Sequence, residues 1–355
     1  MELLLEELYK TDISTEKFHQ RKIFIDEQSY QINGITKSGK TKLVKNYLLS
    51  LKRKNSYLYI NCFDVRLDIE KLNNSLTKFC NQNKIDVLVL DNYLPNIKIP
   101  NVSQLIITCE ENYELSFLQT IQLYPLDYEE FLAYEHKYDS TALNHYFQLG
   151  GFAFMHKISP DERNFYIQNA LKTSLSEIEF EILIYCAKFV AQKISPFSVY
   201  ERLKTVRKIS KDKLYKSFES LMNKKYLHQL EKYEHKRATK KIYLCDISLK
   251  SALSVEKNFG RLFENMVYLE LLKSNEDTYY LDDIDFYIPK KDEIVLCKPF
   301  ADERRLFQKL ESIEAFIFSY NIKKITAVSM NKEGSISHPL STVEIVPFDI
   351  WALGD

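Results

Sequence analysis

The stretch that decides the fold covers residues 34–41 and runs Gly34-Ile35-Thr36-Lys37-Ser38-Gly39-Lys40-Thr41. It matches G-x-x-x-x-G-K-[ST] at every position, a pattern typical of loops that hold nucleotide phosphates. The two glycines let the backbone curl so that successive N–H groups point at phosphate oxygens. The lysine brings a positive charge to the β- and γ-phosphates, and the last threonine hydroxyl is a Mg²⁺ ligand. The stretch therefore predicts a site for a nucleoside triphosphate with Mg²⁺.

The surroundings of this loop support the same interpretation. Glycine is scarce: the chain has 7 glycines among 355 residues, whereas glycine usually makes up about 7% of the residues of a protein. Two glycines at the required spacing are therefore no by-product of composition. Residues 29–33 can form a short strand before the loop. Residues 42–49 can form a helix whose N-terminal dipole faces the phosphates.

The composition bounds the class of protein. A chain of 355 residues is long enough for two or three domains. It has no apolar run of membrane-spanning length and no signal peptide at its start, so a cytoplasmic location without membrane contact is expected. Its six cysteines contain no C-x-x-C pair, which predicts single buried thiols in place of a zinc site or a disulfide framework.

After the loop, apolar stretches alternate with helical patterns. Strands are expected at 57–61, 86–91, 105–108 and 120–123, and residues 22–25 suggest an edge strand before the loop. This alternation predicts an α/β fold with a parallel sheet. The strand 86–91 ends in Asp91, which predicts a carboxylate that holds Mg²⁺ through water. Thr108, at the tip of the next strand, is a candidate sensor of the γ-phosphate, although an ordinary strand-end threonine is an equal alternative.

Two features indicate slow hydrolysis. Asn92 follows Asp91, where many ATPases of this kind carry a glutamate; an amide can orient a water but cannot accept its proton. No arginine occurs between Arg66 and Arg163, so the second half of the sheet supplies no arginine finger. Either turnover is slow, or another subunit or domain completes the site.

The middle of the chain predicts a winged helix. Three helical patterns at 176–192, 196–204 and 210–223 precede two short strands near 226–233 and 240–246. Residues 202–241 hold 14 Lys and Arg against 4 Asp and Glu, although the whole chain carries no net charge. This surplus indicates contacts with the phosphates of duplex DNA, for which the candidates are Lys211, Lys213, Lys216, Lys236 and Arg237. A basic solvated face without a nucleic-acid partner is the alternative.

Several segments resemble one family of proteins. They are Tyr124-Pro125-Leu126-Asp127-Tyr128-Glu129-Glu130-Phe131-Leu132, then Tyr146-Phe147-Gln148-Leu149-Gly150-Gly151-Phe152, and Phe259-Gly260-Arg261-Leu262-Phe263-Glu264-Asn265-Met266-Val267. They are similar to segments of bacterial and archaeal AAA-type (STAND-like) P-loop ATPases. The family joins an ATPase domain to a winged helix and a restriction-endonuclease-like domain. The resemblance implies ATP as the nucleotide and domains at 1–173, 174–254 and 255–355.

The same resemblance implies a nuclease metal site of the form D…E-x-K in the last domain. Asp285 and Lys298 occupy the expected places, and Glu264 supplies an outer carboxylate. Leu296 stands where relatives carry the second acidic ligand, and an apolar side chain cannot bind a metal ion. A degenerate nuclease domain without cleavage activity is therefore expected.

Three functions compete at this stage. The first is a slow ATPase whose nucleotide state, ATP or ADP, controls a DNA-binding winged helix. The second is a DNA nuclease that uses ATP as a switch. The third is a regulatory scaffold that binds ATP without hydrolysis and engages protein through its basic face. An oligomer or a partner protein is compatible with each of them.

Overall fold

The computed structural model describes residues 1–13, 20–51, 57–138, 140–274 and 276–354. The chain divides into two compact units, Met1–Tyr124 and Pro125–Asp355, which we call unit 1 and unit 2. This division precedes the first predicted domain boundary, at 173/174. The predicted three-domain division stays a prediction. Within the described ranges, no helix is long and apolar enough to cross a membrane.

Unit 1 is built on a five-stranded sheet in the order β2-β3-β4-β1-β5. Every neighbouring pair runs parallel, which confirms the predicted parallel sheet and the mixed α/β class. The strands are β1 (Tyr30–Asn33), β2 (Tyr57–Asn61), β3 (Val87–Asp91), β4 (Gln104–Cys109) and β5 (Gln119–Gln122).

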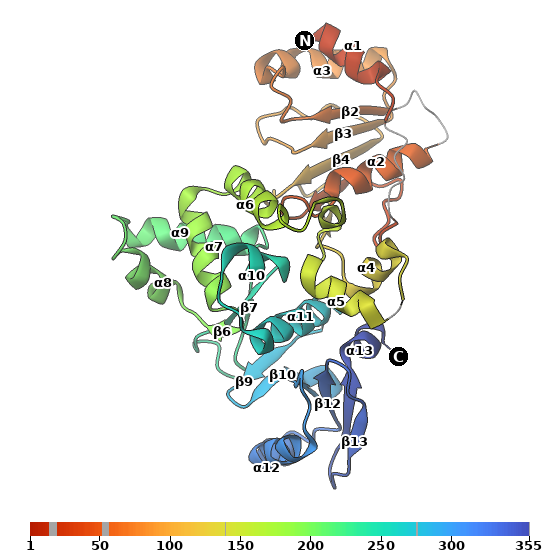
Figure 1. The fold of residues 1–355 in the computed structure, drawn as a ribbon. Coiled ribbons are helices and arrows are strands. Elements are labelled where there is room, and N and C mark those ends of the chain that lie inside the picture. Colours follow the sequence, from red (N-terminus) through yellow and green to blue (C-terminus); the bar gives the residue numbers. More distant parts are fainter. Residues whose placement is uncertain (14–19, 52–56, 139, 275, 355) are drawn as a thin grey trace. The chain divides into compact units, whose positions relative to one another are not determined.

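Helices cover both faces of this sheet (Figure 1). They are α1 (Glu2–Lys10), α2 (Lys40–Ser50) and α3 (Ile69–Gln82). Strand β3 shows why both faces are covered. Leu88 and Leu90 join the apolar cluster that contains α1 and α3 residues, whereas Val87 and Val89 join the cluster of α2. A strand buried on both faces accounts for the continuous apolar run that the sequence shows here.

The predicted edge strand at 22–25 is wrong, since the structure assigns no strand to these residues. Ile23 and Ile25 instead pack against the apolar cluster on the α2 face of the sheet, while Phe24 between them is exposed. The alternation of apolar residues is therefore real, but it buries two side chains on the sheet face without adding a strand to its edge.

Unit 2 begins with helices and continues into a small sheet. Its first elements are α4 (Tyr128–Glu135), α5 (Ser140–Leu149), η1 (Ala153–Lys157), α6 (Arg163–Ser174), α7 (Glu177–Lys188), β6 (Gln192–Lys193), α8 (Pro196–Leu203), α9 (Lys211–Asn223), β7 (Leu227–Leu230), β8 (Lys241–Leu244) and α10 (Ser248–Leu253). The predicted helices at 176–192, 196–204 and 210–223 appear as α7, α8 and α9. The two predicted strands appear as β7 and β8, and β6 completes an antiparallel sheet in the order β6-β8-β7.

The rest of unit 2 contains a six-stranded sheet in the order β13-β14-β12-β11-β10-β9. Its elements are α11 (Phe259–Lys273), β9 (Tyr279–Leu281), β10 (Ile284–Ile288), η2 (Pro289–Lys291), β11 (Glu293–Cys297), α12 (Glu303–Ser319), β12 (Lys324–Ser329), β13 (Gly334–Ile336), β14 (Thr342–Pro347) and α13 (Phe348–Leu353). Helix α12 packs on one face of this sheet through a single apolar cluster.

Direct contacts join the two sheets of unit 2. The Tyr233 N–H donates to the carbonyl of Tyr280 at 3.0 Å, and the Tyr280 N–H donates to that of Glu231 at 2.9 Å. The buried Asn265 side chain of α11 bonds to both the N–H and the carbonyl of Leu244 in β8. The loop after β7 and strand β8 are thus fixed to the C-terminal part of the chain.

Candidate functional site

The loop 34–39 joins β1 to α2, and both of its glycines have a geometric reason. Gly39 has a φ of 102°, a left-handed conformation that lets α2 begin at Lys40. A Cβ on Gly34 would lie 2.5 Å from the carbonyl oxygen of Leu123. Ile35 between them is buried, whereas Thr36 is half-buried and Lys37 is exposed. The sequence pattern therefore corresponds to a tight turn between strand and helix.

Lys40 is buried at the start of α2 and lies across the loop. Its Nζ donates to the carbonyl of Gly34 at 2.6 Å and to that of Ile35 at 2.9 Å. Burial lowers the pKa of this ammonium, while the negative charges of Glu110 and Asp91 act in the opposite direction. The Lys40 ammonium thus lies inside the curl of the loop, where it would contact a bound phosphate group.

Ser38 supplies a test of whether a phosphate fits this loop. Its Oγ is buried, and among the described residues it has no hydrogen-bond partner. A buried hydroxyl without a partner costs free energy, roughly 1–3 kcal/mol. A phosphate oxygen would satisfy it together with the loop N–H groups and Lys40. The donors present therefore fit a nucleotide phosphate.

Asp91 at the end of β3 accepts hydrogen bonds from three hydroxyl groups. Thr41 Oγ1 donates to Asp91 Oδ2 at 2.8 Å. The Tyr59 hydroxyl donates to the same oxygen, and Thr108 Oγ1 donates to Oδ1. All three donors are neutral hydroxyls, which bring no positive charge to the carboxyl group. The hydroxyl and carboxylate oxygens of Thr41 and Asp91 are ligands that Mg²⁺ prefers.

The other two predicted residues are held close to Asp91. The fully buried Thr108 hydroxyl also accepts from the N–H of Asn92 at 2.9 Å. Asn92 has a φ of 57°, and its amide donates to Asn61 Oδ1 at 3.0 Å. Thr108 therefore holds the oxygen of Asp91 that does not contact Thr41, and Asn92 is hydrogen-bonded to the end of β2. Their roles as sensor and as water-orienting residue stay predictions.

Sequence reasoning missed two residues of this site, Tyr59 and Arg21. Arg21 Nη1 donates to the carbonyl of Ser38 at 3.1 Å, and Nη2 donates to that of Tyr124 at 2.8 Å. An arginine within the same chain thus lies beside the phosphate loop. The predicted lack of an arginine finger concerns the residues between Arg66 and Arg163, and no pattern marks position 21. Tyr59 reaches Asp91 only because β2 pairs with β3.

The predicted nucleic-acid residues lie on α9 and on the β7–β8 loop, residues 231–238. Lys211, Lys213 and Lys216 are exposed on α9. The helix buries Leu214, Phe218 and Leu221, as the spacing indicates. No ion pair is recorded for these three lysines within the described part of the chain. The Lys211 ammonium lies over the rings of Phe197 and Tyr215, at 5.5 and 5.4 Å.

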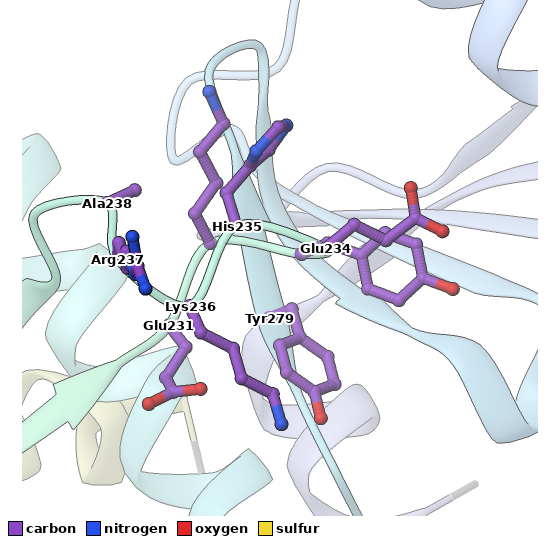
Figure 2. A pocket seen from close by; sticks show the side chains of 9 residues that line it. Glu231, Glu234, His235, Lys236, Arg237, Ala238 and Tyr279 are labelled. Atoms are coloured by element: carbon purple, nitrogen blue, oxygen red, sulfur yellow. The ribbon is translucent and has the colours of Figure 1, made fainter.

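The β7–β8 loop surrounds an open hollow of about 770 Å³ (Figure 2). Lys236 and Arg237 line it and are exposed, and Tyr279 contributes a ring. Glu231 pairs with Lys240, and Glu234 accepts from the Tyr320 hydroxyl at 2.8 Å. The acidic residues of the loop therefore have partners of their own, and the cations at its tip face solvent.

The residues of the predicted degenerate nuclease site have other partners. Glu264 is buried, and its Oε1 accepts from Lys241 Nζ at 2.7 Å and from the Tyr243 hydroxyl at 2.9 Å. Burial raises the pKa of Glu264; Lys241 lowers it, and the charge of Asp285 adds to the increase. Asp285 accepts from the N–H of Cys297 at 2.8 Å. Among the described residues, no group of three or more His, Cys, Asp or Glu could hold a metal ion.

Leu296 and Lys298 complete this region. Leu296 lies in the apolar core between the six-stranded sheet and α12, among residues such as Leu310 and Ile313. Its side chain therefore faces α12. The N–H of Lys298 donates to the carbonyl of Val328. The residue missed here is Lys241, whose ammonium neutralises Glu264.

Comparison with known proteins gives limited similarity. No family model matches the chain. An uncharacterized protein of Methanocaldococcus jannaschii is 24% identical over an alignment of 395 residues, which covers 91% of this chain and 87% of that protein. The Orc1 protein of Aeropyrum pernix in complex with DNA is 15% identical with a TM-score of 0.30, covering 65% of this chain and 87% of that one. Cdc6p of Pyrobaculum aerophilum is 12% identical with a TM-score of 0.25, at 68% and 88% coverage. Both scores are too low to establish a shared overall fold.

Proposed function

We propose that this chain binds ATP with Mg²⁺ at residues 34–41 and hydrolyses it slowly. The observation that carries the proposal is the 2.8 Å hydrogen bond between Thr41 and Asp91. It joins the end of the phosphate loop to the carboxylate at the end of β3, which is the arrangement that a Mg-triphosphate site requires. The unpartnered Ser38 hydroxyl and the buried Lys40 support it from the phosphate side.

Each residue has a defined part in this proposal. The N–H groups of residues 34–39 and the Lys40 ammonium bind the phosphates, and Thr41 and Asp91 hold Mg²⁺. The ion neutralises charge on the phosphates. Asn92 orients a water and cannot take its proton, which limits the rate. Arg21, beside the loop, brings a positive charge from within the same chain.

Calorimetry with ATP and Mg²⁺ tests nucleotide binding. Lys40→Ala removes a charge-assisted contact, so affinity is expected to fall by about an order of magnitude or more. Lys42→Ala is the matched control, because it removes the same charge from an exposed position on the same helix. Equal affinities of wild type and Lys40→Ala would contradict the proposal. The expected turnover lies well below roughly 10 s⁻¹, the median for enzymes.

We further propose that α7, α8, α9 and the β7–β8 hairpin form a winged helix that binds duplex DNA, and that the nucleotide state controls this contact. Three exposed lysines on α9 and two exposed cations at the loop tip support it. Contacts with phosphates weaken steeply as salt rises. Reversal of Lys211, Lys213 and Lys216 to Glu is expected to weaken binding of all sequences alike.

The matched control reverses Lys10, Lys71 and Lys78, which are exposed in unit 1. It changes the net charge equally without touching α9. No detectable binding to duplex at about 50 mM salt, a permissive condition, would favour the alternative of an ATP-binding scaffold that engages protein.

The nuclease alternative is disfavoured by the Lys241–Glu264 pair. Nicking of supercoiled plasmid with Mg²⁺ or Mn²⁺ that disappears in Asp285→Ala would restore it.

A further inference from the structure

We propose that Tyr59 is a positioning residue for the Mg²⁺ site: its hydroxyl holds Asp91 Oδ2 in place for the ion. This inference rests on the proposed function and names a residue to which the sequence analysis assigns no role in the site. The hydroxyl of Tyr59 and that of Thr41 both donate to Oδ2. When the Thr41 hydroxyl turns its lone pairs toward a cation, the bond from Tyr59 is the one that still fixes this oxygen.

The fold holds the Tyr59 ring in the position that this role needs. Tyr59 lies on β2, opposite Val89 of β3 in the parallel register, so its side chain rises beside the strand that ends in Asp91. The Lys45 ammonium lies 5.3 Å from the ring centroid. Lys45 and Thr41 are four residues apart on α2, and such residues share one face of a helix. The helix that presents Thr41 therefore also covers the Tyr59 ring.

The chemistry of the phenol suits a donor to a carboxylate. The hydroxyl is a neutral donor, so its hydrogen bond holds Asp91 Oδ2 without bringing a positive charge to it. The Thr108 hydroxyl donates to the other oxygen of Asp91. Two neutral donors from two strands, β2 and β4, therefore orient one carboxyl group.

Strand β2 offers a matched control. Tyr57 is two residues before Tyr59 and packs against the same apolar cluster, as residues of equal parity in a strand do. Among the described residues, the donors to Asp91 are Thr41, Tyr59 and Thr108, and the Tyr57 hydroxyl does not contribute. Tyr57→Phe therefore removes the same atom from the same face of the same strand without touching the carboxylate.

The experiment measures ATP affinity by calorimetry with Mg²⁺ and with a chelator, for wild type, Tyr59→Phe and Tyr57→Phe. We expect Tyr59→Phe to reduce the gain in affinity that Mg²⁺ brings by about tenfold, the effect of losing one hydrogen bond to a charged group. Affinity in chelator and the melting temperature should stay near wild type. In an Asp91→Asn background, Tyr59→Phe should have little further effect, because the partner of its hydroxyl has changed.

Three outcomes would contradict either the role of Tyr59 or the proposed function. A full Mg²⁺ gain in Tyr59→Phe would overturn this inference and leave the proposed function standing. An equal loss in Tyr57→Phe would also overturn it, because the effect would then come from strand packing. No ATP binding by wild type would overturn the proposed function itself.

Discussion

Two buried carboxylates differ in the groups that donate to them: Asp91 in unit 1, a predicted Mg²⁺ ligand, and Glu264 in unit 2, a predicted member of the degenerate nuclease site. The donors to Asp91 are the hydroxyls of two threonines and a tyrosine. The donors to Glu264 are the Tyr243 hydroxyl, the ammonium of Lys241 and, at 3.5 Å, the guanidinium of Arg261. Neutral donors orient a carboxylate and leave its charge available to a cation. An ammonium cancels that charge within the protein.

This difference separates a binding site from a structural contact. A buried ion pair is costly to break but brings little net stability, because both charges lose their water. The Lys241–Glu264 pair therefore joins β8 to α11 and leaves no net charge for a metal. The Thr41–Asp91 hydrogen bond joins α2 to β3 and brings no positive charge to the carboxylate, which interacts electrostatically with the buried Lys40 ammonium.

The largest effect is expected from Leu296→Glu, which restores the acidic residue of the nuclease pattern. The new carboxylate would lie in the apolar core beneath α12, and burial of an unpaired charge costs several kcal/mol, about 4 or more. Urea unfolding should show loss of the native transition. Phe318→Glu is the control, since this α12 side chain is 74% exposed. A folded Leu296→Glu that nicks plasmid with Mg²⁺ would contradict our account of this region.

The next effect concerns the buried pair itself. Lys241→Met and Glu264→Gln each leave one partner without its counterpart, and each is expected to lower the free energy of unfolding by about 3–5 kcal/mol. The double variant should lose less than the sum of the two. Equilibrium unfolding of all four proteins measures the coupling. Simple additivity would show that the two charges do not depend on each other.

A third carboxylate, Asp246, extends the comparison to a group that is closed to solvent. It accepts from the N–H of Gly151 at 2.6 Å and from that of Ser248 at 2.8 Å. Burial raises its pKa to about 6, whereas these hydrogen bonds act in the opposite direction. Because the folded state binds this proton more tightly than the unfolded state, its contribution is present at low pH and is lost as pH rises through about 6.

The difference in stability between wild type and Asp246→Asn should therefore change between pH 4 and 7, by on the order of 3 kcal/mol. The wild type loses stability relative to the variant as the pH rises, since asparagine does not titrate. Urea unfolding at a series of pH values provides the comparison. A difference that is constant over this range would mean that Asp246 titrates alike in the folded and unfolded chain.

The smallest effect is expected at Asn92, next to Asp91. Asn92→Glu supplies a general base and should raise turnover if only the base is missing. The positive φ of 57° disfavours glutamate, by about 1 kcal/mol, so the variant should also be slightly less stable. Asn92→Gln is the matched control with the same strain and no carboxylate. Equal turnover in all three proteins would place the limiting step elsewhere.

The sequence predicts features of this chain that depend on local order. Residues 34–41 are contiguous, and Asp91 ends an apolar strand, so both could be found without a structure. The ion pair of Lys241 with Glu264 and the hydrogen bond of Tyr59 to Asp91 could not be found from the sequence. Each depends on which strand or helix lies next to which, and the residues carry no periodic signal. The prediction of a strand at 22–25 was wrong for a related reason. An alternation of apolar residues shows which side chains are buried, but it does not show whether their backbone pairs with another strand.

The most direct test of the account compares the Mg²⁺ dependence of ATP affinity in wild type, Asp91→Asn and Glu264→Gln, measured by calorimetry at a temperature where all three are folded. We expect Mg²⁺ to strengthen ATP binding in wild type and Glu264→Gln alike, and to bring little gain in Asp91→Asn. A gain that survives in Asp91→Asn would contradict the claim that this carboxylate, with its neutral donors, is the cation site. So would a gain that disappears in Glu264→Gln.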